Sequence, residues 1–327
     1  MWIQFVTHVH QRSPRCLQQL FKTSRPGVNR IYMFSLPAPV INDTLDPKRK
    51  TPMKPLWLLD NYLLERSVPD SGLSFPEALL ATGCEVSRHC FDLRKRALSG
   101  NLPDLPGRPV IAYGSYAFVR HVLSSAAPAV PRPGAYMRTE ELSFHRFAAH
   151  IGDLLLNDDF HILPFAELKR RPAPNHDVFV RPDRVTKAFT GFRVPAATFE
   201  FEINCLDRLS GVGSDELVVV AGAKTIDLEC RYVIADGGVV AKSTYGWTDG
   251  FVPSAETDPR CDAVAVEVSR RDWQPDTVYT CDVALSGGRA RVVELNSFSC
   301  SGLYACDTDA VARAVTACVI DEYGLFG

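Results

Sequence analysis

The stretch RVVELNSFSCSGLYACD, from Arg291 to Asp307, decides how the rest of the sequence is interpreted. It begins as an apolar strand, yet Glu294 and Asn296 place a carboxylate and a carboxamide two residues apart within it. Side chains alternate along a strand, so these two share one face. Small residues follow at once, which predicts a loop that turns beside a bound molecule.

The preceding strand can supply a third oxygen ligand. The segment before Glu294 predicts a hairpin that turns at Gly287-Gly288. A plain two-residue loop would send the Asp282 side chain to the other face, whereas an odd loop or a bulge would set Asp282 opposite Glu294. In the second case Asp282, Glu294 and Asn296 form a set of hard oxygen ligands, which suits Mg²⁺. The alternative is a solvated strand face that carries acids.

A second hairpin, LECRYVIADGGVVAKST, carries two cations. Asp236-Gly237 predicts a two-residue turn of type I′. Counting outward from that turn sets Arg231 directly opposite Lys242. Like charges in that position are destabilising unless an anion lies between them. The pair therefore indicates an anion site, and the alternative is a solvent face on which the two side chains splay apart.

A third segment, DVFVRPDRVTKAFTG, combines a strand and a basic loop. The strand delivers Arg181, and the loop contains Lys187 before it closes with Thr190 and Gly191. Lysine is a common phosphate ligand, and small loop residues let backbone N–H groups approach a phosphate. Alone, the segment is weak evidence for a phosphate site, since a basic loop is usually an ordinary solvated loop.

The length, composition and charge of the chain limit the class of protein to which it can belong. Its 327 residues, 46% hydrophobic and 23% charged, are typical of a soluble globular protein with room for two domains. The net charge of -2 gives no reason to expect nucleic acid or a membrane surface as a partner. Ten cysteines without a CxxC pair indicate reduced thiols, and hence a cytoplasmic protein, rather than a disulfide framework.

The organisation predicted is α+β. Residues 1–52, basic and interrupted by prolines, are expected to be a poorly ordered extension. Residues 53–130 alternate strand and helix, which predicts a small parallel α/β domain. After a proline-rich linker, residues 131–327 form the second domain, which from 177 onward reads mainly as strands. One of these strands is predicted at ATFEFEI (197–203), and helices are predicted near 258–270 and at the end of the chain.

Taken together, these elements resemble the ATP-grasp superfamily. More narrowly, they are similar to a small clade of bacterial and phage ATP-grasp proteins named for two arginines and a lysine. The motifs that carry the resemblance are FVRPD…K.FTG, E.RYVI.DG.VVA.S.Y and D…VVELNSFSCSGLYACD. The resemblance covers about residues 53–327. It implies an ATP-grasp fold with a small N-terminal α/β (pre-ATP-grasp) domain.

The resemblance also implies roles for individual residues. Asp282, Glu294 and Asn296 match the Mg²⁺ ligands. The hinge, Val218 to Ala221, would meet adenine through its backbone. Arg181, Arg231 and Lys242 would surround the phosphates or an acyl phosphate. The implied nucleotide-binding set is Lys187, Thr190, Gly191, Val218, Val219, Val220, Ala221 and Glu229.

The activity implied is ATP- and Mg²⁺-dependent ligation. A carboxylate would be activated as an acyl phosphate and attacked by an amine, with amino acids, peptides or similar small molecules as substrates. Such catalysis depends on positioning and charge neutralisation, so it needs no nucleophilic side chain. Two alternatives stay open: an ATP-dependent phosphotransferase, and a nucleotide-binding protein with little turnover. A monomer and a homodimer are both compatible with the sequence.

Overall fold

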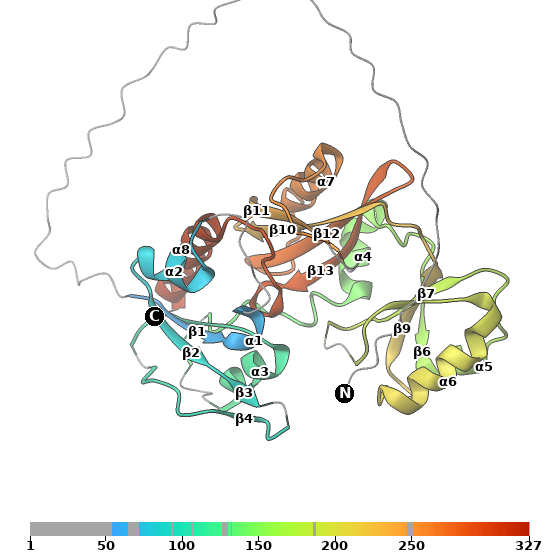
Figure 1. Ribbon diagram of the computed structural model, residues 1–327, viewed down its shortest axis with the longest axis horizontal. Coiled ribbons are helices and arrows are strands. Elements are labelled where there is room, and N and C mark those ends of the chain that lie inside the picture. Colours follow the sequence, from blue (N-terminus) through green and yellow to red (C-terminus); the bar gives the residue numbers. More distant parts are fainter. Residues whose placement is uncertain are drawn as a thin grey trace, which may run out of the picture. The chain divides into compact units, whose positions relative to one another are not determined.

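The computed structural model describes residues 54–64, 72–92, 94–105, 107–125, 130–131, 133–185, 188–246 and 251–326. They belong to one compact unit, Lys50–Gly327. The predicted extension, residues 1–52, lies outside the described residues, and so does Lys187. The described strands form one three-stranded sheet, two four-stranded sheets and one two-stranded ribbon (Figure 1). Within these ranges, no helix combines the length and the apolar character that crossing a bilayer requires.

The first sheet is parallel, with the order β2-β1-β5. This is the strand pairing that the alternation of strands and helices predicts. Its apolar strand β1 is fully buried, and the neighbouring helix α2 begins with a capping box between Ser74 and Glu77. The elements of this region are β1 (Leu56–Asp60), α1 (Asn61–Leu64), α2 (Phe75–Ala81), β2 (Glu85–His89), β3 (Phe91–Asp92), β4 (Ala97–Leu98), β5 (Val110–Tyr113) and α3 (Tyr116–Ser125).

The second sheet is antiparallel, with the order β6-β9-β7-β8, so β9 lies in its centre. One of its faces packs against α5 and α6. The elements are α4 (Phe144–Ile151), η1 (Gly152–Leu154), β6 (His161–Pro164), α5 (Phe165–Arg170), β7 (Val178–Pro182), β8 (Phe192–Val194), η2 (Ala196–Thr198), α6 (Phe199–Leu209) and β9 (Leu217–Gly222).

The strand predicted at ATFEFEI was wrong, because these residues lie in η2 and α6. The alternation of phenylalanine and glutamate has the period of a strand. The residues that are buried, however, are Phe199, Ile203 and Leu206, which follow helical spacing, while Phe201 is 65% exposed. A longer window, taking in Leu206, favours the helix.

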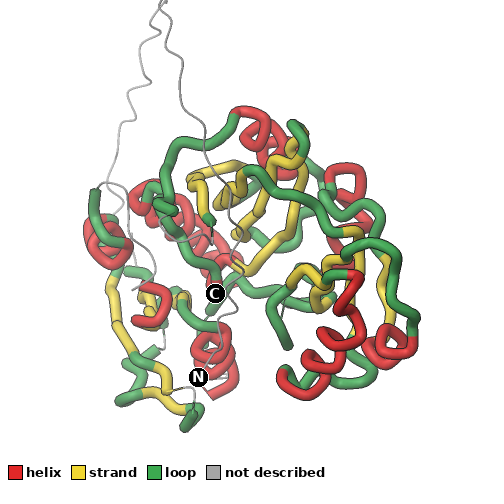
Figure 2. Tube along the Cα trace, turned by 45° about the vertical axis from the view of Figure 1, so that its right-hand side comes forward, coloured by secondary structure: helices red, strands yellow, loops and turns green. Residues whose placement is uncertain are grey.

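The third sheet is antiparallel, with the order β11-β10-β12-β13. Helices α4 and α7 pack on one of its faces, while α8 and residues of the first sheet pack on the other (Figures 1 and 2). The core around Trp57 therefore joins the first sheet to the third. The elements are β10 (Leu228–Ala235), β11 (Gly238–Tyr245), α7 (Pro259–Ser269), β12 (Val278–Ser286), β13 (Arg289–Ser297), η3 (Phe298–Cys300) and α8 (Thr308–Phe326).

Candidate functional site

The hairpin of β12 and β13 has the register that a metal site requires. It turns through Gly287 and Gly288, both at positive φ, and pairs Ser286 with Arg289. This is a two-residue loop, but the ladder then shifts by one residue, which leaves Val293 as a bulge. Beyond the bulge Asp282 lies opposite Glu294. The prediction that an odd loop or a bulge would align the two acids is confirmed.

Asp282, Glu294 and Asn296 share one face of the sheet and contact one another. Asn296 Nδ2 donates to Glu294 Oε1 at 2.7 Å and to Asp282 Oδ2 at 3.2 Å. Asp282 is fully buried, whereas the Glu294 side chain keeps 22% of its surface exposed. The carboxamide thus bridges two carboxylates that would otherwise repel each other.

Arg231 neutralises Asp282 in a fork-to-fork arrangement. Its Nε donates to Oδ1 at 2.8 Å and its Nη2 to Oδ2 at 2.7 Å, while Nη1 donates to the Gly302 carbonyl at 3.1 Å. The guanidinium carbon also lies 5.2 Å from the ring centre of Tyr245 and 5.1 Å from that of Tyr304. These bidentate and cation–π contacts hold Arg231 in one position.

Arg181 links the second sheet to the third. It is buried on β7, and its Nη2 lies 2.9 Å from Glu294 Oε2 on β13. Gly191 lies beside it, since a Cβ there would stand 3.0 Å from Arg181 Cβ and 2.7 Å from the ring of Phe179. Thr190 is exposed next to Gly191. The structure therefore brings Arg181, Gly191 and Glu294 together.

Lys242 lies apart from this cluster, and the register predicted for its hairpin was wrong. The turn at Asp236-Gly237 does pair Ala235 with Gly238, but a bulge at Val240 shifts every pair beyond it. Arg231 consequently lies opposite Ser243, and Lys242 lies opposite Tyr232. Because one residue of shift moves a side chain to the other face, Lys242 lies with α7, where its Nζ donates to Asp262 Oδ2 at 2.7 Å.

The hinge residues on β9 have their backbone engaged in the sheet. Val218, Val219 and Val220 have strand partners on both β6 and β7. From Ala221 onward only β7 remains as a partner, and Gly222 N donates to Asp159 Oδ2 at 3.1 Å. Backbone groups that are open to a ligand therefore start at the end of β9, and not in its middle.

Glu229 faces the same side of the sheet as Arg231 and lies directly opposite Tyr245, whose hydroxyl donates to Glu229 Oε1. Burial, together with the nearby charges of Asp282 and Glu294, raises the pKa of Glu229 to about 7. The hydrogen bond from Tyr245 and the positive charge of Arg231 act in the opposite direction. Glu229 is thus a carboxyl group that exchanges a proton near neutral pH.

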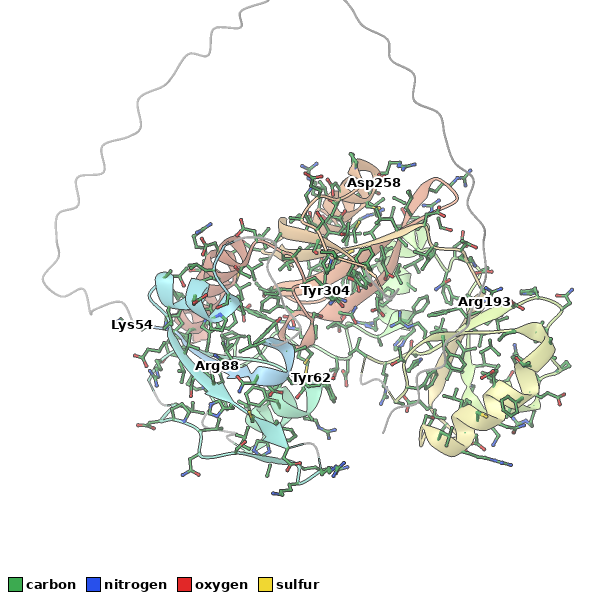
Figure 3. All side chains as sticks on the ribbon, in the orientation of Figure 1. Lys54, Tyr62, Arg88, Arg193, Asp258 and Tyr304 are labelled. Carbon is green, nitrogen blue, oxygen red and sulfur yellow. The ribbon has the colours of Figure 1, made fainter. Side chains whose placement is uncertain are left out.

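A cavity of about 310 Å³ lies at the end of β9. Its lining includes the segment that leads from β9 to β10, and Arg193 on β8, which Figure 3 shows beside the second sheet. Arg193 Nε donates to Asp177 Oδ2 at 2.9 Å at the rim. The lining residues are His176, Asp177, Arg193, Gly222, Ala223, Lys224 and Thr225.

The oxygen cluster fits Mg²⁺ by the chemistry of its donors. Among the described residues, no group of three or more His, Cys, Asp or Glu side chains is arranged to hold a metal ion. The cluster instead offers two carboxylates, Asp282 and Glu294, and the carboxamide of Asn296. Mg²⁺ takes hard oxygens of this kind, usually one or two carboxylates together with phosphate oxygens and water.

Two aromatic residues of the site were missed by the sequence reasoning. Tyr245 and Tyr304 stack with ring centres 4.9 Å apart and an interplanar angle of 3°. Figure 3 shows Tyr304 beside the third sheet. Both tyrosines occur in the quoted motifs, S.Y and SGLYACD, but nothing in these motifs indicates that the two rings meet at Arg231.

The chain is similar to solved structures of ATP-grasp enzymes. D-cycloserine synthetase DcsG has a TM-score of 0.55 at 15% identity, covering 81% of this chain and 99% of that one. D-alanyl-alanine synthetase A from Vibrio cholerae has 0.52 at 12%, covering 84% and 99%. A RimK domain ATP-grasp protein from Sphaerobacter thermophilus has 0.50 at 15%, covering 82% and 98%. At these identities the likeness shows the fold.

No curated protein sequence matches the chain. A family model does: the ATP-grasp domain, family 3 of the clade named for two arginines and a lysine, matches residues 126–315, which is more than half of the chain. The matched region contains the second and third sheets, both hairpins, and every residue of the oxygen cluster and its two arginines. The chain therefore belongs to this family of ATP-grasp domains.

Proposed function

We propose that the protein is an ATP- and Mg²⁺-dependent ligase, which activates a carboxylate as an acyl phosphate and transfers the acyl group to an amine. The observation that carries this proposal is the register of β12 and β13, which aligns Asp282 with Glu294 and adds Asn296 on the same face. Each acid also meets an arginine, Arg231 or Arg181. Membership of the ATP-grasp family supports the same reaction class.

The nucleotide would lie along β7 and β9. The cavity at the end of β9 offers backbone groups for adenine, and Asp177 at its rim lies four residues before Arg181. Four residues of strand span about 13 Å. The triphosphate would then extend from the cavity toward Arg181 and Glu294. In this arrangement the adenine contacts start after Val220.

Asp282, Glu294 and Asn296 would hold the Mg²⁺ ion. When bound, the ion would neutralise phosphate charge. Asn296 directs its Nδ2 toward both carboxylates, so presenting three oxygens together requires that amide to turn over. Glu294 is the accessible ligand, since part of its side chain is exposed.

Arg181 and Arg231 would stabilise the charge that moves during the reaction. In the first step a substrate carboxylate oxygen bonds to the γ-phosphorus, the bond to the β-phosphate oxygen breaks, and ADP leaves. In the second step the amine nitrogen bonds to the acyl carbon, the C–O bond breaks, phosphate leaves with the electron pair, and the amine loses a proton. Fixed guanidinium groups are suited to both steps because negative charge develops on phosphate oxygens in each.

The test is ADP release from ATP and Mg²⁺ in the presence of pooled amino acids and short peptides, with products identified by mass. A product whose mass is that of one acid plus one amine, minus one water, supports ligation. A phosphorylated acceptor without ligation indicates a phosphotransferase instead. Nucleotide binding with no product in any pool, together with unchanged ADP release in Glu294→Gln, would contradict the proposal.

The setting proposed for this reaction is the cytoplasm. Nine cysteines lie among the described residues, and all nine are free thiols. Six of them are buried, as small apolar side chains would be. This pattern supports a reducing compartment, where ATP is also available.

A further inference from the structure

A histidine–aspartate pair lies next to the arginine that joins the two antiparallel sheets. His145 Nδ1 lies 2.8 Å from Asp183 Oδ2, and Asp183 is 1% exposed. The His145 side chain, in contrast, is 49% exposed. Because the carboxylate holds Nδ1, the nitrogen that faces outward is Nε2. The pair is not part of the cluster described above.

The position of the pair follows from β7. Asp183 comes two residues after Arg181, on the side away from the cavity at the end of β9. His145 is the second residue of α4, and Phe144, the first, lies with its ring 5.8 Å from the Arg181 guanidinium carbon. The order along β7 is therefore the cavity, then Arg181 with Glu294, then Asp183 with His145.

Capping of α4 does not account for the imidazole contact. The first two N–H groups of the helix are already satisfied, since Phe144 N donates to the Asp183 carbonyl at 2.8 Å and His145 N donates to Asp183 Oδ1 at 2.8 Å. The second carboxylate oxygen additionally fixes the His145 ring. An arrangement of this kind, a buried acid that orients an exposed imidazole, is typical of histidines that donate or accept a proton at a ligand.

We infer that His145 is a further ligand of the terminal phosphates, with Asp183 as its positioning residue. In the proposed orientation of the nucleotide, adenine lies at the cavity and Arg181 lies along the phosphate chain, so Nε2 of His145 meets the γ-phosphate end. With a proton on each ring nitrogen, the imidazole donates from Nδ1 to Asp183 and from Nε2 to a phosphate oxygen there. This inference rests on the proposed function, because it requires ATP to lie along β7.

The experiment compares three nucleotides that differ only in their phosphates. Binding of the β,γ-imido analogue of ATP, of ADP and of AMP is measured by calorimetry with Mg²⁺. His145→Asn keeps a donor that reaches Asp183 but removes Nε2, and we expect about tenfold weaker binding of the triphosphate analogue, as for loss of one hydrogen bond to a charged group. Binding of ADP should weaken less than binding of the triphosphate analogue, and binding of AMP should be unchanged.

Two variants serve as controls. His145→Gln restores an N–H near the position of Nε2, so it should recover part of the lost affinity for the triphosphate analogue. His150→Asn makes the same substitution five residues later on α4, where the ring stacks on Trp273 with centres 4.3 Å apart, and should bind all three nucleotides like the wild type. Thermal unfolding of each variant identifies any loss of the fold.

The outcomes separate the two proposals. If wild-type protein binds none of the nucleotides, the proposed function fails and this inference fails with it. If Arg181→Gln weakens binding of the triphosphate analogue while His145→Asn does not, the proposed ATP site is supported and the role inferred for His145 is wrong. Equal weakening of all three nucleotides in His145→Asn would likewise overturn it, because a ligand of the terminal phosphates cannot affect AMP.

Discussion

The two hairpins of the third sheet begin alike and end differently. Each turns through two residues at positive φ, and each contains one bulge in its second strand. In the hairpin of β12 and β13 the bulge brings Asp282 opposite Glu294. In the hairpin of β10 and β11 the bulge instead separates Lys242 from Arg231 and leaves them on opposite faces.

The difference shows what a turn determines and what it does not. Turn residues set the pairs between the turn and the first bulge, because side chains alternate regularly over that distance. Beyond a bulge every pair shifts by one residue and every side chain changes face relative to a simple count. The charges that meet at the site are therefore selected by the bulges.

The largest effect should come from the acids that pair with Arg231 and Lys242, which are Asp282 on β12 and Asp262 on α7. In Asp282→Asn the buried Arg231 loses its carboxylate fork, and breaking a buried pair in this way costs about 3–5 kcal/mol. We expect that loss in the free energy of unfolding from urea denaturation. Asp262→Asn is the matched control, since the pair of Asp262 with Lys242 is partly exposed and should cost about 1 kcal/mol or less. Equal losses of unfolding free energy in Asp282→Asn and Asp262→Asn would contradict this expectation.

Exchanging the cations gives the next effect in size. Arg231→Lys keeps the charge but loses the fork on Asp282 and the stacking on Tyr304, so we expect a loss of about 2–3 kcal/mol in unfolding free energy. Lys242→Arg should be nearly neutral, because the Lys242 contact with Asp262 is partly exposed. If Arg231→Lys left the free energy of unfolding unchanged, the two hydrogen bonds to Asp282 would be shown to contribute little to stability.

The open end of the β10–β11 hairpin returns to the site at Glu229, and it should respond to pH. Because the folded pKa of about 7 lies above the ordinary 4.5, the folded chain binds the proton more tightly than the unfolded chain does. The stability from this group is complete below the unfolded pKa and is lost as the pH rises through the folded pKa. Between about pH 5 and pH 8, wild type should lose about 2–3 kcal/mol more unfolding free energy than Glu229→Gln. If the unfolding free energies of the two proteins changed in parallel with pH, the raised pKa of Glu229 would be refuted.

The smallest effect is expected from removing the bulges themselves. Deleting Val293 leaves Asp282 opposite Glu294, and deleting Val240 leaves Arg231 opposite Ser243, because the bulge residue is the one without a partner in each ladder. Each deletion should cost about 1 kcal/mol, the usual scale of a single change. Only the Val293 deletion should weaken binding of ATP with Mg²⁺, measured by calorimetry, because that bulge bends the strand next to Glu294. Equal binding by both deletion variants would show that the bend does not matter to the site.

Local signals in the sequence predict much of the fold and part of the site. Gly287-Gly288 and Asp236-Gly237 each predict one of the two turns, and the apolar sequence of β1 predicts a buried parallel strand. A bulge has no comparable signal, since Val240 and Val293 are ordinary strand residues, so Lys242 was paired on the wrong face. The exposure of Phe201, which distinguishes α6 from a strand, depends likewise on tertiary packing.

For a similar reason, the sequence alone does not locate the backbone groups of the proposed nucleotide site. An apolar segment such as LVVVAG indicates the hinge strand but not which of its carbonyls and N–H groups the neighbouring strands use. Pairing of Val220 with both β6 and β7 decides that, and it depends on residues far away in the sequence. The pairing of Asp183 with His145, 38 residues apart, was invisible for the same reason.

The backbone of Tyr304 has a consequence for which residues position 304 can accept. Its φ of 52° lies in the left-handed region, within a turn closed by Cys306 N and the Leu303 carbonyl. That conformation costs a non-glycine residue about 1–2 kcal/mol, whereas the contact with Arg231 requires an aromatic ring. In a library randomised at this position, selection for yield of folded protein favours glycine and asparagine. Selection for a correctly held Arg231 favours tyrosine, so the residue found here is a compromise made against stability.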